Sequence, residues 1–192
     1  MKERILKSVV LSSLISVASS SLAEVVDLRE LQKGCAAKSG GALVTCLQEA
    51  LNKANTSWVF SESVNPMNDE VTRVLAKKEE PPERPQGYSL MLGIRCGSEV
   101  YASIDAGRYI GSKNTIQYRF DKDQARTEEW HSTDSKTAFI APGGKEFVNK
   151  LIQSKRLVFQ FDVVGKGTRV AVFNLDGIDK AVKRIVSTCP VS

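Results

Sequence analysis

The residues of this chain best suited to chemistry lie in one short stretch, but they cannot act together. His131 is the single histidine, with Ser132 beside it and Asp134 shortly after. A hydrolase triad needs its serine, histidine and carboxylate to converge on one point. In an extended strand, adjacent residues such as His131 and Ser132 point to opposite faces. We therefore expect no triad here and interpret His131 as a surface residue.

Carboxylates near predicted turns suggest a second kind of site, for calcium. Asp121 and Asp123 are the first pair, and Asn174 and Asp176 follow later in the chain. Their spacing is not that of an EF-hand, and turns and helix caps favour Asx residues in any case. One histidine and no Cys-x-x-Cys motif also argue against zinc. We expect no metal, no cofactor, no catalytic residue and no enzymatic activity.

The four cysteines carry the remaining chemistry, and their even number predicts two disulfides with three possible connectivities. Cys35 and Cys46 lie on two short predicted helices, so a bridge between them would staple a helical hairpin and contribute ~2–3 kcal/mol. Cys189 is in phase with the apolar face of the last predicted helix. Cys96 ends a core strand, and we expect it to pair with Cys189.

The first 23 residues have the pattern of an export signal. A basic start, 1–7, precedes a short apolar run with small residues before the predicted cleavage site at Ala23. The run is too short and too rich in serine to span ~30 Å of hydrocarbon. We therefore expect a cleaved signal peptide at 1–23, a periplasmic mature protein, and no stable membrane insertion after cleavage.

The charge balance bears on the class of partner. Cleavage would lower the formal net charge from +5 to about +3, and the acids and bases of the mature chain are interspersed. Nucleic-acid binding requires a clustered basic face, so we expect no nucleic-acid partner.

Hydropathy patterns divide the mature chain into a helical hairpin with a polar linker, 24–56, and a β-rich domain, 57–192. The predicted helices of the hairpin are 27–35 and 42–51, and 52–56 forms the linker. About eight strands and two amphipathic helices follow. We predict a mainly β (α+β) fold, an antiparallel β-sandwich or open barrel with one or two packed helices, preceded by the disulfide-stapled hairpin.

Two features of the β-rich domain could bind a partner. Arginine and tyrosine dominate interface energetics, and strand alternation predicts an outward face that carries Arg95, Tyr101, Asp105 and Arg119. The alternative is a solvated face with cross-strand ion pairs. The segment Lys77–Gly87 holds three of the six prolines, and it is predicted to be a solvated loop, either an inert connector or the rim of a binding face.

A series of short motifs is also present. It comprises Trp58, Ser63–Asp69, Leu90–Cys96, Val100–Asp105, Tyr118–Asp121, Trp130–Asp134, Phe147 with Leu151, Arg156 with Leu157, and Val172–Ile178, and it closes on Cys189. This series, with the Cys35…Cys46 hairpin, resembles the VasI/TagO family of periplasmic proteins associated with type VI secretion systems. In that family Tyr-Asp usually follows the second cysteine, whereas Leu47 and Gln48 stand here. The resemblance implies a non-enzymatic accessory protein that supports assembly or regulation of the secretion machine through a protein partner in the envelope.

Other classes are compatible with a small exported β domain. One is an inhibitor or binder of a hydrolase such as lysozyme, which would insert an exposed loop, and Lys77–Gly87 is the candidate. Another is an orphan protein-interaction module. A cell-wall hydrolase would need paired carboxylates, which the sequence does not place together.

Overall fold

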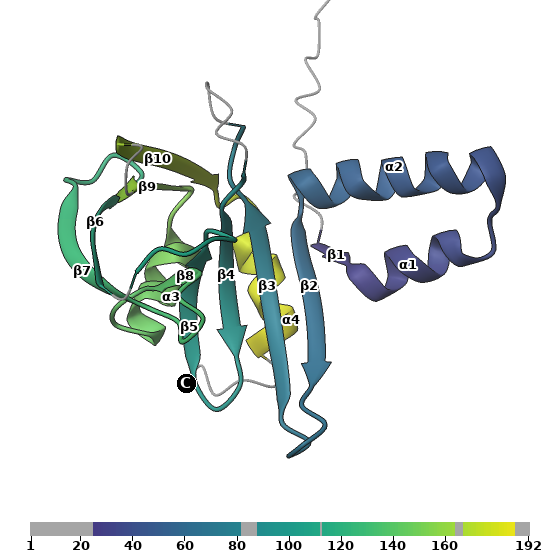
Figure 1. Cartoon of the computed structure of the whole chain (residues 1–192), viewed down its shortest axis with the longest axis horizontal. Helices are drawn as coiled ribbons and strands as arrows, with labels where there is room; N and C mark the ends of the chain where they lie inside the picture. Colours follow the sequence, from purple (N-terminus) through teal and green to yellow (C-terminus); the bar gives the residue numbers. More distant parts are fainter. Residues whose placement is uncertain (1–24, 82–87, 112, 164–166, 187–192) are drawn as a thin grey trace, which may run out of the picture.

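The computed structural model describes residues 25–81, 88–111, 113–163 and 167–186 (Figure 1). The strands are β1 (Val25–Asp27), β2 (Trp58–Val64), β3 (Val71–Lys78), β4 (Met91–Cys96), β5 (Val100–Asp105), β6 (Lys113–Phe120), β7 (Arg126–Ser132), β8 (Ala138–Ile140), β9 (Arg156–Val163) and β10 (Gly167–Asn174). The helices are α1 (Leu28–Ala36), α2 (Gly40–Thr56), α3 (Lys145–Gln153) and α4 (Ile178–Val186). The expected mainly β (α+β) fold is confirmed.

All these strands form one sheet in the order β1-β2-β3-β4-β5-β8-β7-β6-β9-β10. β1 pairs with β2 in parallel, and the other pairs are antiparallel. The sheet curls, so that β6 and β7 lie to the left of α3 in Figure 1 and β9 and β10 lie above it. The backbone N–H of Glu80, just after β3, donates to Val172 O of β10 at 2.7 Å. A single curled sheet is nearer to the open barrel than to a sandwich of two sheets.

The concave side of the sheet holds the core because apolar residues alternate along its strands. Helices α3 and α4 cover this side with fully apolar faces, and Leu151 and Ala181 have no exposed surface. Aromatic rings fill the curl with centroids 4.9–5.9 Å apart, at Tyr118, Phe120, Trp130, Phe139, Phe147, Phe159 and Phe161. These contacts give the body a packed core that begins at Trp58.

The hairpin α1–α2 projects from this body (Figure 1). The predicted disulfide joins Cys35 and Cys46, with a Cα–Cα distance of 5.9 Å. The predicted linker 52–56 is wrong, because α2 continues to Thr56 and Ser57 N then donates to Lys53 O. The segment is polar because this part of the helix faces water. β1, three residues long, was too short for an alternation signal, and it anchors the start of the hairpin beside β2.

Cys96 is buried at 2 % exposure and is disulfide-bonded. Cys189 lies outside the described residues, so its pairing with Cys96 remains a prediction, as does the signal peptide 1–23. Within the described part of the chain, no helix is long and apolar enough to cross a membrane. The Cys35–Cys46 disulfide indicates a non-cytoplasmic protein, because reducing compartments keep thiols free.

Candidate functional site

The structure brings together two of the four predicted partner residues. Arg95 on β4 and Tyr101 on β5 are direct cross-strand neighbours, and both are half-buried on the outer side of the sheet. Arg95 Nε donates to Ser103 Oγ at 3.3 Å. Arg95, Tyr101 and Ser103 are called the Arg95 face below. The hydrogen bond holds the guanidinium along the sheet, so the face is ordered and polar.

The other two predicted residues do not join this face. Asp105 is on the same strand as Tyr101, but its Oδ1 accepts a hydrogen bond from Gly107 N at 2.7 Å and caps the turn after β5. Arg119 is exposed on β6, and β8 and β7 lie between β5 and β6 in the sheet. At ~4.8 Å per strand spacing, β6 is therefore about 14 Å from β5, and Arg119 is not a neighbour of Arg95 or Tyr101. Sequence parity could not reveal this, because it does not report strand order.

The residues considered for catalysis or calcium have ordinary surroundings. His131 is exposed on β7. Asp121 Oδ1 accepts from the backbone N–H groups of Lys155 and Arg156, each at 2.9 Å, and so ties the end of β6 to β9. No cluster of three potential metal ligands occurs among the residues that the structure describes.

The predicted solvated loop Lys77–Gly87 is wrong in its first three residues. β3 extends through Lys78, and Lys77 is 7 % exposed with its Nζ bonded to Thr56 O. Burial lowers the pKa of Lys77, against the opposing influence of Asp176 and Glu80. Residues 82–87 lie outside the described residues. The charged residues of this segment suggested a solvated loop. Alternation along an extended chain nevertheless turns every second side chain towards the core, so Lys77 and Glu79 are buried.

Glu79 and Arg169 form a buried ion pair, with exposed fractions of 4 % and 1 %. Glu79 Oε1 also accepts from Leu90 N at 2.8 Å, and Arg169 Nη2 donates to Tyr88 O at 3.1 Å. Burial raises the pKa of Glu79, against the opposing effects of Leu90 N–H and Arg169. The pair spans ninety residues of sequence and joins the end of β3 to β10.

Several buried polar atoms around this pair have no hydrogen-bond partner within the described residues. They are Glu79 Oε2, Arg169 Nε, Arg169 Nη1 and the Tyr88 hydroxyl. The Arg169 guanidinium lies 4.1 Å from the Tyr88 ring centroid. Buried polar groups are almost always hydrogen-bonded in folded proteins, so this concentration of unsatisfied atoms distinguishes the region from the rest of the core.

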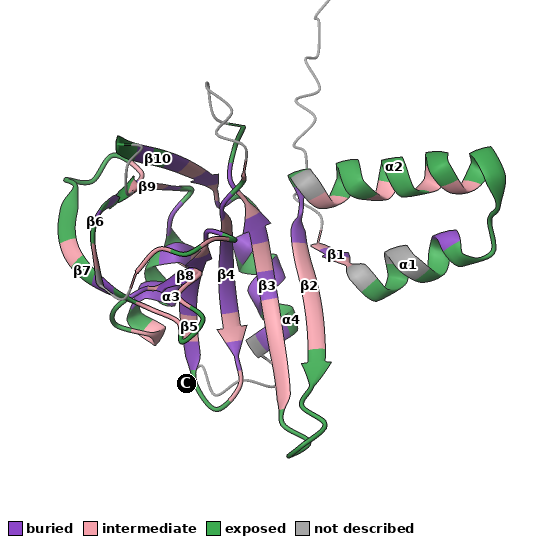
Figure 2. Cartoon of the chain, viewed as in Figure 1, coloured by how far each residue is buried: buried purple, intermediate pink, exposed green. Residues whose placement is uncertain are grey.

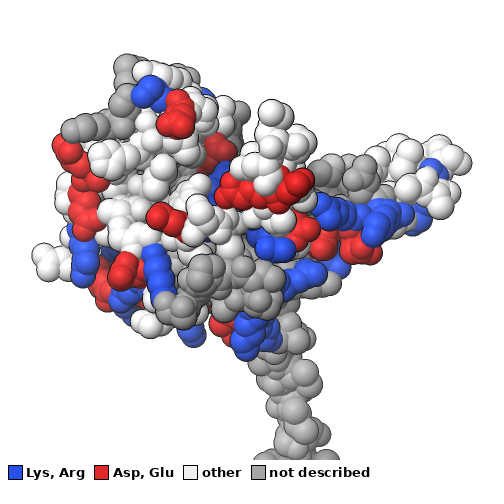
Figure 3. Space-filling view, turned by 90° about the horizontal axis from the view of Figure 1, so that it is seen from below, with Lys and Arg blue, Asp and Glu red and all other residues white. Residues whose placement is uncertain are grey.

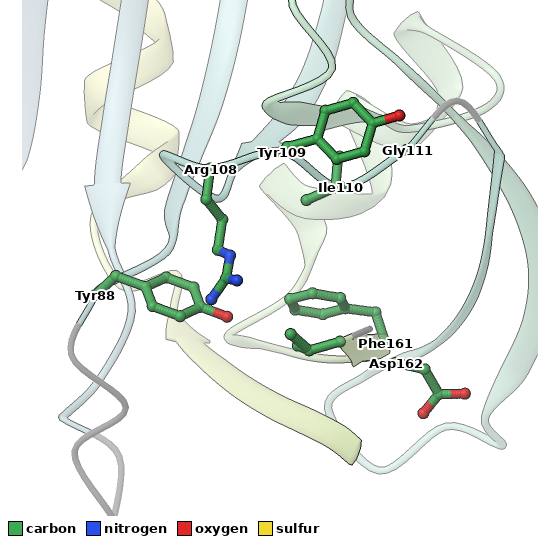
Figure 4. A pocket seen from close by; sticks show the side chains of 8 residues that line it. Tyr88, Arg108, Tyr109, Ile110, Gly111, Phe161 and Asp162 are labelled. Atoms are coloured by element: carbon green, nitrogen blue, oxygen red, sulfur yellow. The ribbon is translucent and has the colours of Figure 1, made fainter. Parts of the chain in front are cut away.

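A pocket of about 350 Å³ lies beside the same tyrosine (Figure 4). It is called the Tyr88 pocket below, and its lining residues are Tyr88, Arg108, Tyr109, Ile110, Gly111, Phe161, Asp162 and Val163. They come from the segment before β4, the β5–β6 connection and the end of β9. Because these three segments are far apart in sequence, no local pattern predicted the pocket.

A second hollow of about 330 Å³ lies between the β6–β7 pair and α3. Glu128 and Glu146 both line it, together with the cationic side chains of Arg126 and Lys150. Glu128 Oε2 accepts from the Tyr118 hydroxyl at 3.1 Å, and burial with this carboxylate raises the pKa of Tyr118. The hollow therefore combines two carboxylates with two cationic side chains.

Helix α2 exposes a run of apolar side chains. Val44, Leu47 and Leu51 are 66 %, 46 % and 60 % exposed, and their i, i+3, i+7 spacing places them on one helix face. They are called the α2 stripe below. The apolar side chains of this helix do not share one buried face: Leu43 and Cys46 are half-buried, while Leu47 and Leu51 face water. Most of α2 is exposed in Figure 2.

Surface charge does not concentrate at one place on the face shown in Figure 3. Acidic and basic side chains are interspersed there, including along the hairpin. On the face shown, this agrees with the interspersed charges of the sequence.

Comparisons with known proteins give little to set beside this geometry. No protein-family model matches the chain, and no curated protein matches it. Among solved structures, the chain is similar to invasion associated protein B from Bartonella henselae, with 13 % identity and a TM-score of 0.42. The similarity covers 67 % of this chain and 92 % of that chain. A likeness this distant transfers no function.

Proposed function

We propose that this protein is an exported binding protein of the cell envelope that holds a protein partner through the α2 stripe. The observation that carries the proposal is the exposure of Val44, Leu47 and Leu51 on one face of a projecting helix. Burying one such side chain is worth ~1.5–3 kcal/mol. The three side chains are half to two-thirds exposed, so a partner that covers them gains roughly half of this amount from each. Clustered exposed apolar residues are also typical of interaction sites.

The disulfide makes the hairpin suitable for this role. Isolated helices shorter than ~12–15 residues are marginal in water, and α1 has nine residues. The Cys35–Cys46 bridge holds α1 against α2 whether or not a partner is bound. A surface that is ordered before binding loses less conformational entropy when the complex forms.

The proposed biological role is accessory, in the assembly or regulation of a type VI secretion system in the periplasm. The motif series that resembles the VasI/TagO family supports this role. The Arg95 face is a second candidate contact surface, since it offers a tyrosine beside a hydrogen-bonded arginine. Interface hot spots are enriched in these two residue types.

Site-specific crosslinking in the living envelope tests the proposal. A photo-reactive phenylalanine derivative is placed at position 47 in the α2 stripe, at 101 in the Arg95 face, or at 117, an exposed control position on β6. Mass spectrometry then identifies the captured proteins. We expect position 47 to capture an envelope component of the secretion machine and position 117 to capture none.

A matched pair of variants checks which property of α2 matters. The double variant Leu47→Asp, Leu51→Asp should lower the amount of captured partner at least tenfold, whether capture uses the crosslinker at position 101 or an affinity tag. The control Gln48→Asp, on the adjacent exposed surface, should leave this amount unchanged. Capture of a muramidase would instead support the hydrolase inhibitor. Equal capture from positions 47 and 117 would overturn the proposed surface.

A further inference from the structure

The Tyr88 pocket has the size and walls of a ligand site. Its volume of about 350 Å³ falls within the ~300–1,000 Å³ typical of small-molecule pockets. The rings of Tyr88 and Phe161 and the aliphatic side chains of Ile110 and Val163 line it. Tyr109 is 72 % exposed and lies at the edge of the pocket in Figure 4. Such walls favour an apolar or aromatic group.

Two polar side chains of the pocket, Arg108 and Tyr88, are hydrogen-bond donors without an acceptor among the described residues. The Arg108 guanidinium lies 4.9 Å from the Tyr88 ring centroid, and Arg108 forms no ion pair with any residue in the described ranges. The Tyr88 hydroxyl is buried and has no partner among those residues. A carboxylate accepts charge-assisted hydrogen bonds from both kinds of group.

The acidic residue of the pocket does not neutralise this end. Asp162 is exposed, its Oδ1 accepts from Thr168 Oγ1 at 2.7 Å, and its carboxylate points away from Arg108 in Figure 4. The two ends of the pocket therefore differ in charge. A ligand with an anionic group at one end has a single favourable orientation, with that group at Arg108.

The wall formed by Tyr88 is held in place before any ligand binds. Arg169 contacts the Tyr88 ring at 4.1 Å and its carbonyl oxygen at 3.1 Å, and the buried pair with Glu79 holds Arg169 itself. Arg169 and Glu79 are positioning residues for this wall. This positioning role accounts for the burial of two charged groups at a place where an apolar pair of similar volume often gives equal stability.

We infer that the Tyr88 pocket binds a carboxylate carried on an aromatic or other apolar group, with Arg108 and the Tyr88 hydroxyl as the carboxylate donors. Two sources present this chemistry, the C-terminal residue of a polypeptide and a free small carboxylate. The site is separate from the α2 stripe, since it is built on β9 and the β5–β6 connection. It therefore stands or fails independently of the proposed function.

The test is a titration of the ¹⁵N-labelled mature protein, followed by NMR and calorimetry. The probes are N-acetyl-glycyl-phenylalanine, its C-terminal amide and 3-phenylpropionate. We expect the acid to shift the resonances of residues 108–111 and 161–163 and to bind at least tenfold more tightly than the amide. If phenylpropionate matches the acid, a free carboxylate is sufficient; if it binds at least tenfold more weakly, the site selects a polypeptide terminus.

Variants separate the charge from the shape of the pocket. Arg108→Gln should weaken binding of the acid at least tenfold and leave the amide within twofold. Tyr88→Phe, which keeps the ring and removes the hydroxyl, should weaken the acid two- to fivefold. Arg119→Gln, an exposed arginine on β6, is the control and should change nothing. Equal binding of acid and amide, or an unchanged affinity in a folded Arg108→Gln protein, would overturn the inference.

Discussion

The hairpin α1–α2 and the curled sheet keep their shapes by different means. Of the α1 and α2 side chains that the structure describes, Cys35 is the one that is buried, so a covalent bond does the work that packing does elsewhere. The sheet instead encloses fully buried residues such as Trp58, Trp130 and Phe159. The comparison indicates that a module held by a disulfide can leave a row of apolar side chains exposed, whereas the body buries most of its apolar side chains in its core.

The largest expected effect comes from replacing a disulfide cysteine in each region by serine. Cys96→Ser should lower the free energy of unfolding by ~4–5 kcal/mol if Cys96 closes the predicted loop of more than ninety residues to Cys189, whereas Cys35→Ser should cost ~2–3 kcal/mol. Urea denaturation measures both. The unfolding midpoint reported by tryptophan fluorescence of the body should shift in Cys96→Ser and hardly shift in Cys35→Ser. Equal shifts in the midpoint would contradict the division into two regions.

Breaking the buried ion pair should come next. Glu79→Gln leaves the buried Arg169 charge without its partner, and such losses cost ~3–5 kcal/mol. The double variant Glu79→Leu with Arg169→Met should recover most of this, since an apolar pair needs no desolvation of charge. Glu80→Gln is the matched control, because the Glu80–Arg156 pair is solvent-exposed at 3.9 Å and should contribute ~0–1 kcal/mol. A cost for Glu79→Gln no larger than the control's would refute the structural role of the pair.

Lys77 on β3 bonds to Thr56 O at the end of α2 and so links the sheet to the hairpin. The stability of this contact should depend on pH. Burial lowers the pKa of Lys77 from the ordinary value of 10.5, so the folded state releases this proton at lower pH than the unfolded chain does. The folding stability attributable to Lys77 is therefore complete above pH 10.5 and is lost as the pH falls through the lowered pKa. The loss amounts to ~1.4 kcal/mol for each unit by which folding lowers the pKa.

The measurement compares wild type with Lys77→Met by urea denaturation from pH 7 to pH 10.5. Wild type should gain stability relative to the variant as the pH rises. Lys78→Met, at the neighbouring half-buried position, provides the control. A constant difference between wild type and Lys77→Met would show that the amine is not perturbed.

The smallest expected effect is at the α2 stripe. Leu47→Ala should change the free energy of unfolding by no more than ~0.5 kcal/mol, as is usual for exposed positions. The same substitution at Leu151, which is fully buried in α3, should cost ~2–5 kcal/mol. Thermal melts of the two variants sharpen the comparison directly. A loss of several kcal/mol at position 47 would mean that the stripe serves the fold rather than a partner.

Local patterns predicted much of the fold and little of the candidate site. Alternation located β4, β5, β6 and β9, and helical spacing located α4 with its buried residues, because burial on one face imposes those periods. The polar composition of 52–56 led to a wrong prediction of a linker, because an exposed stretch of helix has a similar composition. Polarity was misleading again at Lys77 and Glu79, whose charges are buried through partners that the local sequence does not reveal.

The sequence by itself determined the class of fold, the two amphipathic helices of the body and the Cys35–Cys46 staple. Each of these depends on residues close together in the chain. Only the tertiary structure decided that β8 lies between β5 and β7, which separates Arg119 from the Arg95 face. It also decided the Glu79–Arg169 pair and the Tyr88 pocket. These depend on which distant strands meet when the sheet curls, and many strand orders satisfy the same alternation of apolar residues.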